Sequence, residues 1–394
     1  MKFNFDELTD RRHTSSMKWD GEGDDADVIP LWVADMDFRT APAVVEALRK
    51  RVDQGIFGYV SVPDSYYDAL IRWNRTRHGW EIDRDRVIYT SGVVPALSAI
   101  IKGLTNPGEG VILQTPAYNC FFSSIRNNKC RQIDNPLRRI ATPAGFTYEI
   151  DFESLETLAS DPTNTLMILC NPHNPSGRVW TRDELERVAE ICRRHNVRVV
   201  SDEIHCELVH PGARAYTPYA IIDMDSIVCV SPSKAFNTAG LQIANIICPD
   251  EETQRRIDRA INDNEVCDVN PFGVIGLQAA YNGGGEWLDE LNEYLNANRL
   301  LLRSNFSNHF PQMQICEAEA TYLAWIDVSA LSINGRPADG DSITDYLLHK
   351  AKVRVASGFT YGDASCIRIN YACPRVRLEE ALIRINENLD KLHP

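Results

Sequence analysis

Several patterns that would decide the function of a protein are missing from this sequence. Its 11 cysteines include no C-x-x-C pair and no regular spacing, which excludes a disulfide framework and a thiolate zinc knuckle. The opening residues MKFNFDELTDRRHTSS contain no continuous apolar stretch, so we expect neither a signal peptide nor a membrane span. Neither a G-x-G-x-x-G nor a Walker-type loop is present. Because the cysteines show no disulfide pattern and no signal peptide is expected, we expect a protein of the reducing cytoplasm.

The sequence also has fewer basic than acidic residues. The chain has 41 Lys and Arg against 55 Asp and Glu, a formal net charge of -14. Such a field repels phosphodiester backbones and anionic lipids, so nucleic acid and membranes are not expected partners. The 394 residues, of which 44% are hydrophobic, suffice for one large core and a smaller one beside it.

What the sequence does contain, from about residue 87 to 247, is an alternation of short apolar runs with helical stretches. The runs VILQT, TLMILC, VRVVSD and SIVCVS (111–115, 165–170, 197–202 and 226–231) are typical of buried parallel strands. Thr181 and Glu184 form a capping-box pattern at the start of one helix. The alternation predicts an α/β layer with a mainly parallel sheet, whose ligands bind at the carboxyl ends of the strands.

The pattern changes after three consecutive glycines at 283–285. A long helical stretch (286–308), shorter strands and a closing helix (376–391) follow, which predicts a smaller α+β domain. We expect a large domain over residues 46–285, and a small domain made of residues 1–45, as an amino-terminal arm, and 286–394.

Polar clusters stand where four of the strands should end: SGVV (91–94), NPHNPSG (171–177), SDEIH (201–205) and SPSK (231–234). Each cluster alone is ordinary, because a Ser-Gly pair is usually a turn and a strand-end Asp is usually a cap. In chain order and mutual spacing, however, they resemble the fold type I pyridoxal-phosphate (PLP) family, the aspartate-aminotransferase superfamily, over nearly the whole chain. This resemblance implies a PLP cofactor and the two-domain α/β architecture of that family.

The resemblance assigns the central roles to Lys234 and Asp202. Lys234 matches the lysine that binds the cofactor covalently through its amine and, once released, serves as a general base. Asp202 matches the acid that pairs with the pyridine nitrogen and keeps it protonated. Asn174 matches the asparagine that binds the phenolic oxygen of the cofactor, close to the substrate, and Tyr118 the aromatic residue that stacks on the ring. Without the resemblance, the same residues would be a surface lysine, a cap, a turn and a core tyrosine.

Phosphate binding needs backbone N–H groups at a helix start together with hydroxyl groups. The residues that supply them are Gly92, Val93, Val94, Ser231 and Ser233. The resemblance further implies that Tyr59, in FGYVSVP, reaches the phosphate from the other subunit of a homodimer with shared active sites.

The strand pattern CIRIN (366–370) resembles the family strand whose arginine binds the substrate carboxylate. Arg368 is the candidate, because its planar guanidinium suits bidentate recognition. Otherwise it would be an arginine in a surface salt bridge.

Two departures from a plain aminotransferase narrow the function. Gln242 stands where many relatives have a phosphate-binding arginine, and His205 stands where aspartate aminotransferase has a tyrosine facing the cofactor oxygen. With the segment IPLWVADMDF (29–38), they resemble the MalY/PatB-type cystathionine β-lyases, also called cysteine-S-conjugate β-lyases. That segment would place Trp32, Val33, Ala34 and Asp35 near a bound amino acid, with no chemical role for Asp35. The implied reaction is α,β-elimination of L-cystathionine or another cysteine S-conjugate to a thiol, pyruvate and ammonia.

Three alternatives remain open from the sequence. An aminotransferase would use the same lysine, aspartate and arginine. Some relatives also bind a transcription activator, so a regulatory binding role on the same fold is the second. The third is a metal hydrolase built on His205, Cys206 and His210, with the last two on one helix face, although no recognisable ligand spacing supports a metal.

Overall fold

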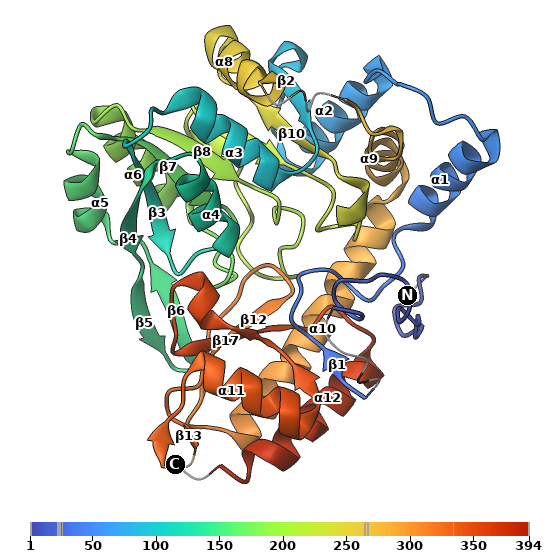
Figure 1. Ribbon diagram of the computed structural model, residues 1–394, viewed down its shortest axis with the longest axis vertical. Helices are drawn as coiled ribbons and strands as arrows, with labels where there is room; N and C mark the ends of the chain where they lie inside the picture. Colours follow the sequence, from blue (N-terminus) through green and yellow to red (C-terminus); the bar gives the residue numbers. More distant parts are fainter. Residues whose placement is uncertain are drawn as a thin grey trace.

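The computed structural model describes residues 2–21, 25, 27–263, 265, 268–333 and 335–392. Its main sheet has seven strands in the order β2-β10-β9-β8-β7-β3-β4 (Figure 1). Only β10 runs antiparallel to its neighbours. The strands are β2 (Val87–Thr90), β3 (Gly110–Thr115), β4 (Arg131–Pro136), β7 (Asn164–Cys170), β8 (Arg198–Asp202), β9 (Ile227–Val230) and β10 (Ala244–Ile247).

Helices cover both faces of this sheet because its central strands are apolar on both sides. On β8, Val200 packs into the core beneath one layer of helices and Val199 into the core beneath the other. The first layer consists of α3 (Val93–Leu104), α4 (Asn119–Asn127) and α8 (Glu251–Asn262). The second consists of α5 (Phe152–Ala159), α6 (Arg182–Arg194) and α7 (Tyr219–Ile222).

A smaller sheet lies beside the first, in the order β11-β12-β17-β16. Its strands are β11 (Gln314–Ile315), β12 (Leu323–Asp327), β16 (Ala356–Ser357) and β17 (Cys366–Asn370). The helices α10 (Gly285–His309), α11 (Gly340–Tyr346) and α12 (Arg375–Leu389) accompany it (Figure 1). Near the amino terminus, β1 (Ile29–Pro30) pairs in parallel with β15 (Val353–Arg354), which ties the first segment of the chain to this smaller unit.

The remaining elements connect or extend these two units. Three helices pack together beside the main sheet: α1 (Pro42–Gln54), α2 (Asp64–His78) and α9 (Pro271–Gly283). Two hairpins, β5 (Arg138–Thr142) with β6 (Gly145–Glu149) and β13 (Ser332–Ile333) with β14 (Arg336–Pro337), lie outside the main sheets. None of the described helices combines the length and the apolar character that crossing a bilayer requires.

The predicted α/β fold with a mainly parallel mixed sheet is confirmed. Each of the four predicted strands forms within one residue of its expected limits, and Thr181 and Glu184 make both hydrogen bonds of the capping box. The division into domains at 45/46 and 285/286 stays a prediction. The pairing of β1 with β15 supports placing the arm with the small domain, but residue 46 lies within α1.

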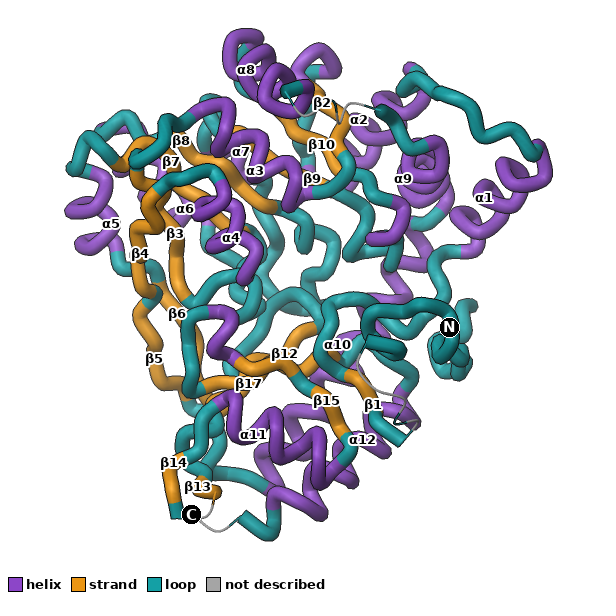
Figure 2. The backbone as a smooth tube through the Cα atoms, in the orientation of Figure 1, coloured by secondary structure: helices purple, strands orange, loops and turns teal. Residues whose placement is uncertain are grey.

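Because β10 is antiparallel to both β2 and β9, the strands β2, β9, β8, β7 and β3 all point the same way. Their carboxyl ends therefore meet at one edge of the sheet. Loops occupy the region between the main sheet and the smaller sheet (Figure 2). Three of the polar clusters follow β2, β7 and β9 directly, and the fourth begins with the last two residues of β8, so the topology collects them at this edge.

Candidate active site

A cavity of about 190 Å³ lies at the carboxyl edge of the main sheet. It brings together residues from all four polar clusters, which are separated by up to 143 positions in the sequence (Ser91 to Lys234). The lining residues are Ala34, Ser91, Gly92, Val93, Val94, Pro95, Tyr118, Cys170, Asn174, Asp202, Ile204, His205, Ser233, Lys234, Ala239 and Ile243. Most of the predicted site residues thus share one cavity.

Lys234 is positioned by the turn that follows β9. Its Nζ donates a hydrogen bond to the carbonyl oxygen of Ala34 at 2.7 Å. Burial lowers the pKa of its amine to about 8, and the nearby cation of Arg368 acts in the same direction, while Asp35 and Asp202 oppose the shift. A larger fraction of the amine is therefore uncharged near neutral pH than for an ordinary lysine, which favours nucleophilic and base chemistry.

Asp202 is the last residue of β8 and is only 4% exposed. One carboxylate oxygen accepts a hydrogen bond from the Ile204 N–H at 3.1 Å. Burial nevertheless raises the pKa of this carboxyl to about 6, because the Ile204 N–H and the charge of Lys234 compensate only part of the desolvation. A cation placed beside it would pair with an acid that is otherwise poorly solvated.

Arg368 lies in the middle of β17 and is 3% exposed. Its Nη1 donates to Asn174 Oδ1 at 3.2 Å and its Nη2 donates to the Trp32 carbonyl at 3.1 Å. The guanidinium carbon lies 4.5 Å from the centre of the Tyr361 ring. Among the described residues no carboxylate forms an ion pair with it, and its Nε has no acceptor. A buried guanidinium in this state is suited to binding a carboxylate ligand.

Tyr118 caps the start of α4, with its ring edge-on to Phe121 at 5.7 Å between centroids. Burial raises the pKa of its hydroxyl well above the usual value, so this hydroxyl stays protonated. Gly92, which also lines the cavity, is the N-cap of α3, and Val93 and Val94 begin its first turn. The first N–H groups of a helix have no acceptor within it, so this end suits an anion.

Four predicted residues do not line the cavity: Arg368, which contacts the lining residue Asn174, and the three that follow. Ser231 does not line the cavity: its hydroxyl donates to the Ile243 carbonyl at 2.6 Å and accepts the Ser233 N–H at 3.1 Å, so it shapes the turn that presents Ser233. Tyr59 is 96% exposed on the loop between α1 and α2. Val33 contributes its carbonyl, which accepts a hydrogen bond from Asn370 at 2.6 Å.

The helix face expected for the metal alternative does not form. Directly after β8, residues 203–209 form turns and a β-bridge and no helix. Both ring nitrogens of His210 contact backbone carbonyls, those of Ala318 and Thr321. A different group, His78, Cys206 and Glu207, brings its possible ligand atoms within 4.8 Å, but Glu207 already pairs with Arg77. The metal-hydrolase hypothesis therefore finds no support in the geometry of its residues.

Several residues that the sequence did not single out take part in this site. Asn370 lies two residues after Arg368 on β17, and Asn237 lies three residues after Lys234; both bind the backbone of the segment that contains Ala34. The period-2 alternation of a strand places residues 368 and 370 on the same face. That signal could have identified Asn370, whereas no local signal identifies Asn237.

His205 lines the cavity and is 2% exposed, and its Nδ1 has no hydrogen-bond partner in the part of the chain that the structure describes. Burial, helped by the cations of Lys234 and Arg368, lowers the pKa of its imidazole to about 3. The ring therefore stays neutral at physiological pH. A neutral ring can donate through one nitrogen and accept through the other.

Acid is expected to destabilise the cofactor-free protein in part through His205. Its pKa in the folded state lies below the ordinary 6.5, so stability that is present above pH 6.5 is lost as the pH falls. Between pH 7 and pH 5 this one group contributes a loss of about 2 kcal/mol. Urea unfolding at both pH values would show that His205→Gln loses about 2 kcal/mol less than the parent. The exposed His349 provides the control, His349→Gln, and equal losses in all three proteins would contradict the prediction.

Comparison with known proteins adds the family. The family model described as "Aminotransferase class I and II" matches residues 26–385. The chain is 39% identical to the cystathionine beta-lyase PatB of Bacillus subtilis, over 98% of this chain and 100% of that protein. It is 34% identical to Protein MalY of Escherichia coli, over 96% and 97% of the two chains. The structure of a PLP-bound C-S lyase from Staphylococcus hominis is 32% identical, covers 98% of this chain and 99% of its own, and superposes with a TM-score of 0.89.

The match to the family model spans most of the chain, and the relatives align with it over nearly their whole length. The predicted resemblance to this superfamily, and within it to the MalY/PatB-type proteins, is confirmed. The chain belongs to the class I and II aminotransferase family.

Proposed function

We propose that this protein is a PLP-dependent carbon–sulfur β-lyase that cleaves L-cystathionine or other S-conjugates of L-cysteine. The proposal rests on three groups at one cavity. Lys234 supplies an amine with a lowered pKa and Asp202 a buried acid. Arg368, bound to the cavity-lining Asn174, supplies a buried guanidinium that has no carboxylate partner among the described residues. The similarity to proteins named cystathionine beta-lyase and C-S lyase supports this choice over other reactions of the family.

The residues present fit pyridoxal phosphate. Lys234 would bind its aldehyde carbon, Asp202 would face its ring nitrogen, and the first turn of α3 with Ser233 would hold its phosphate. The unpartnered Nδ1 of the neutral His205 offers a further contact. When bound, this cofactor supplies an electron sink that stabilises negative charge at the α-carbon of an amino acid.

The residues of the chain then divide the work of elimination. Arg368 binds the substrate carboxylate and so fixes the α-carbon near Lys234. The amine of Lys234 takes the α-proton, which its lowered pKa favours. The bond between the β-carbon and sulfur breaks, the sulfur leaves as a thiolate that gains a proton, and water converts the remaining three-carbon fragment to pyruvate and ammonia. Asp202 would stay ionised, so that it could pair with a protonated ring nitrogen of the cofactor.

A lyase and an aminotransferase would use the same residues, so the assay must separate the two reactions. Purified protein charged with PLP is expected to release pyruvate, ammonia and homocysteine from L-cystathionine in equal amounts, without any added keto acid. Pyruvate is measured with lactate dehydrogenase and the thiol with a chromogenic disulfide. Turnover that starts only after a keto-acid acceptor is added would contradict the proposal and favour the aminotransferase.

We further propose a homodimer in which Tyr59 reaches the phosphate site of the partner subunit. The loop that carries Tyr59 exposes apolar side chains that a partner would cover: Ile56 is 68% exposed and Phe57 is 57% exposed. We also propose that the reaction takes place in the cytoplasm, which is supported by the ten described cysteines, all free thiols and eight of them buried.

A further inference from the structure

A strap of the chain, residues 32–38, crosses the candidate active site and contacts it mainly through backbone atoms. Ala34 lines the cavity, and its carbonyl oxygen accepts two hydrogen bonds, from Lys234 Nζ at 2.7 Å and from the Tyr322 hydroxyl at 2.9 Å. Two residues earlier, the carbonyl of Trp32 accepts a hydrogen bond from Arg368. The two cationic groups of the site therefore both bind carbonyl oxygens of the same strap.

Two asparagine amides hold the strap beside these contacts. Asn237 accepts the Met36 N–H at 3.0 Å and donates to the carbonyls of Met36 and Phe38 at 2.9 and 2.8 Å. Its backbone φ of 53° lies in the left-handed region that asparagine tolerates. Asn370 donates to the carbonyls of Val33 and Asp35, both at 2.6 Å. The strap is thus held next to Lys234 on one side and next to Arg368 on the other.

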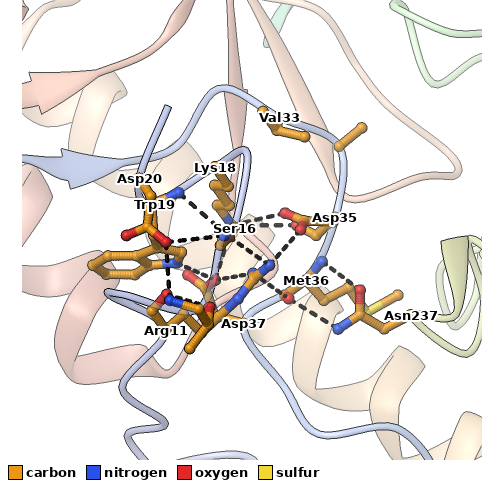
Figure 3. A network of polar contacts seen from close by, with 12 residues as sticks. Arg11, Ser16, Lys18, Trp19, Asp20, Val33, Asp35, Met36, Asp37 and Asn237 are labelled. Atoms are coloured by element: carbon orange, nitrogen blue, oxygen red, sulfur yellow. Dashed lines mark hydrogen bonds and ion pairs between the residues drawn. The ribbon is translucent and has the colours of Figure 1, made fainter. Parts of the chain in front are cut away.

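A largely buried cluster of charges lies against the strap (Figure 3). The side chains of Lys18 and Asp37 are both 0% exposed and form an ion pair at 3.2 Å. Arg11 bridges two carboxylates, binding Asp37 at 2.8 Å and Asp35 at 2.6 Å. Asp37 also accepts a hydrogen bond from the indole N–H of Trp19 at 2.9 Å.

The cluster is connected to the strap along the backbone as well as through side chains. Lys18 Nζ donates to the carbonyl of Asp35 at 3.2 Å, and Arg11 donates to the carbonyl of Met36 at 3.0 Å. Both carbonyls lie within two residues of Ala34. A shift of the strap would break these two hydrogen bonds and move Asp35 and Asp37 away from their cationic partners. Because a buried charge without its partner is costly, the cluster resists such a shift.

From these contacts we infer that Lys18, Arg11 and Asp37 are positioning residues, which hold the Ala34 carbonyl where it binds and orients the free amine of Lys234. The inference rests on the proposed function in so far as that amine is the one that acts on the substrate. The carbonyl gives the amine a fixed place whenever Lys234 is not bonded to the cofactor. An amine held in one place is oriented for proton transfer, which a freely rotating lysine is not.

The same cluster sets part of the charge that Lys234 faces. The charged and titratable groups that act on its amine include Arg368, Asp35, Asp202 and Cys120, and the imidazole of His205 also interacts with its charge. Asp35 raises the pKa of this amine, and Lys18 lies 3.7 Å from the Asp35 carboxylate. Without the charge of Lys18, Asp35 is less compensated, so the pKa of Lys234 is expected to rise.

The test uses the full-length cofactor-free protein, which makes it independent of any lyase activity. Acetic anhydride at limiting concentration labels amines in proportion to their uncharged fraction, and peptide mass spectrometry reports the labelling of Lys234 from pH 6 to pH 10. We expect Lys18→Met to slow labelling at neutral pH by at least ~3-fold, which corresponds to a shift of about half a pKa unit. Lys2→Met removes a lysine of an exposed ion pair, with both side chains 62% exposed, and is expected to leave the profile unchanged.

A second variant guards against misfolding of Lys18→Met. Asn237→Gly retains a residue that adopts positive φ but removes the three hydrogen bonds to the strap without leaving a buried charge. It is expected to increase hydrogen–deuterium exchange in residues 32–38 and to change the labelling rate of Lys234. If folded Lys18→Met or Asn237→Gly labels Lys234 with the parental pH profile, the inference is overturned. Failure of the lyase proposal would appear separately, as absent pyruvate release by the parent enzyme.

Discussion

Replacing Lys234 with alanine is expected to abolish the visible colour of the PLP-charged protein together with pyruvate release from L-cystathionine. Alanine offers no amine to bond to the cofactor and none to take the α-proton. General-base catalysis alone contributes about 10²–10⁴-fold, and loss of the covalent attachment adds to it. A fall in turnover of at least ~10⁴-fold is therefore expected.

The measurements are the absorbance of the protein after incubation with PLP and gel filtration, and the initial rate of pyruvate formation. Lys50→Ala is the matched control, because Lys50 lies on α1 in an exposed pair with Glu46 and should keep both colour and activity. Retention of colour and elimination together in Lys234→Ala would defeat the assignment of this residue, whatever the family membership of the chain.

Replacing Asp202 with asparagine is expected to lower turnover by about 10²–10³-fold while making the cofactor-free protein more stable. The asparagine has the same shape and can still accept the Ile204 N–H, but it carries no negative charge to keep the ring nitrogen of PLP protonated. Breaking a buried charge pair costs about 3–5 kcal/mol, and the lower half of this range corresponds to the expected loss of rate. Because Arg368 still binds the substrate carboxylate, KM should change much less than kcat.

The expected gain in stability follows from the raised pKa of Asp202, about 6 in the folded protein against 3.8. A carboxyl whose pKa is raised by folding contributes stability that is present below pH 3.8 and lost as the pH rises through 6. Above pH 7 the ionised Asp202 of the cofactor-free protein therefore costs about 2–3 kcal/mol, which asparagine relieves. Urea unfolding at pH 8 measures this difference, with the exposed Asp134→Asn as control. A variant with unchanged kcat, or with lower stability at pH 8, would contradict the role of Asp202.

The fall in kcat and the gain in stability that we expect for Asp202→Asn together distinguish a functional residue from one that serves only the fold. A residue that serves only the fold loses stability and activity in parallel when it is replaced. A buried acid that serves a bound cation is a cost to the empty protein, so its removal changes stability and activity in opposite directions.

Much of the main sheet could be predicted because its signals are local. The runs that became β3, β7, β8 and β9 are apolar on both faces and bounded by polar turns, and this pattern alone indicates a buried parallel strand. The capping box at Thr181 could be read for the same reason, since both of its hydrogen bonds join residues three apart. The carboxyl-edge rule then located the cavity, because parallel strands end at the same edge.

Local pattern and tertiary structure differ at two places. Cys206 and His210 have helical spacing, yet the chain turns after Asp202, because Glu203 is buried among hydrogen-bond donors that include Ser201 and the Tyr219 N–H. Ser231 has the right residue type for the phosphate site, but its hydroxyl donates to the Ile243 carbonyl, and its phosphate role stays a prediction. Residue type and spacing indicate which interactions a side chain can make. They do not indicate which partner the fold places beside it.

The sequence by itself determined four strands of the main sheet, one capped helix and the strand ends that carry polar residues. Through its likeness to a known family it also gave Lys234, Asp202 and Arg368 as candidate site residues. Only the tertiary structure decided how the strap over the cavity is held, by Lys18 and Asp37, which lie against it, and by Asn237 and Asn370 beside it. The physical reason is that apolar periodicity records which face of an element is buried. The compensation of a buried charge or amide depends on a partner that is in some cases about 200 positions away, and no local pattern records that partner.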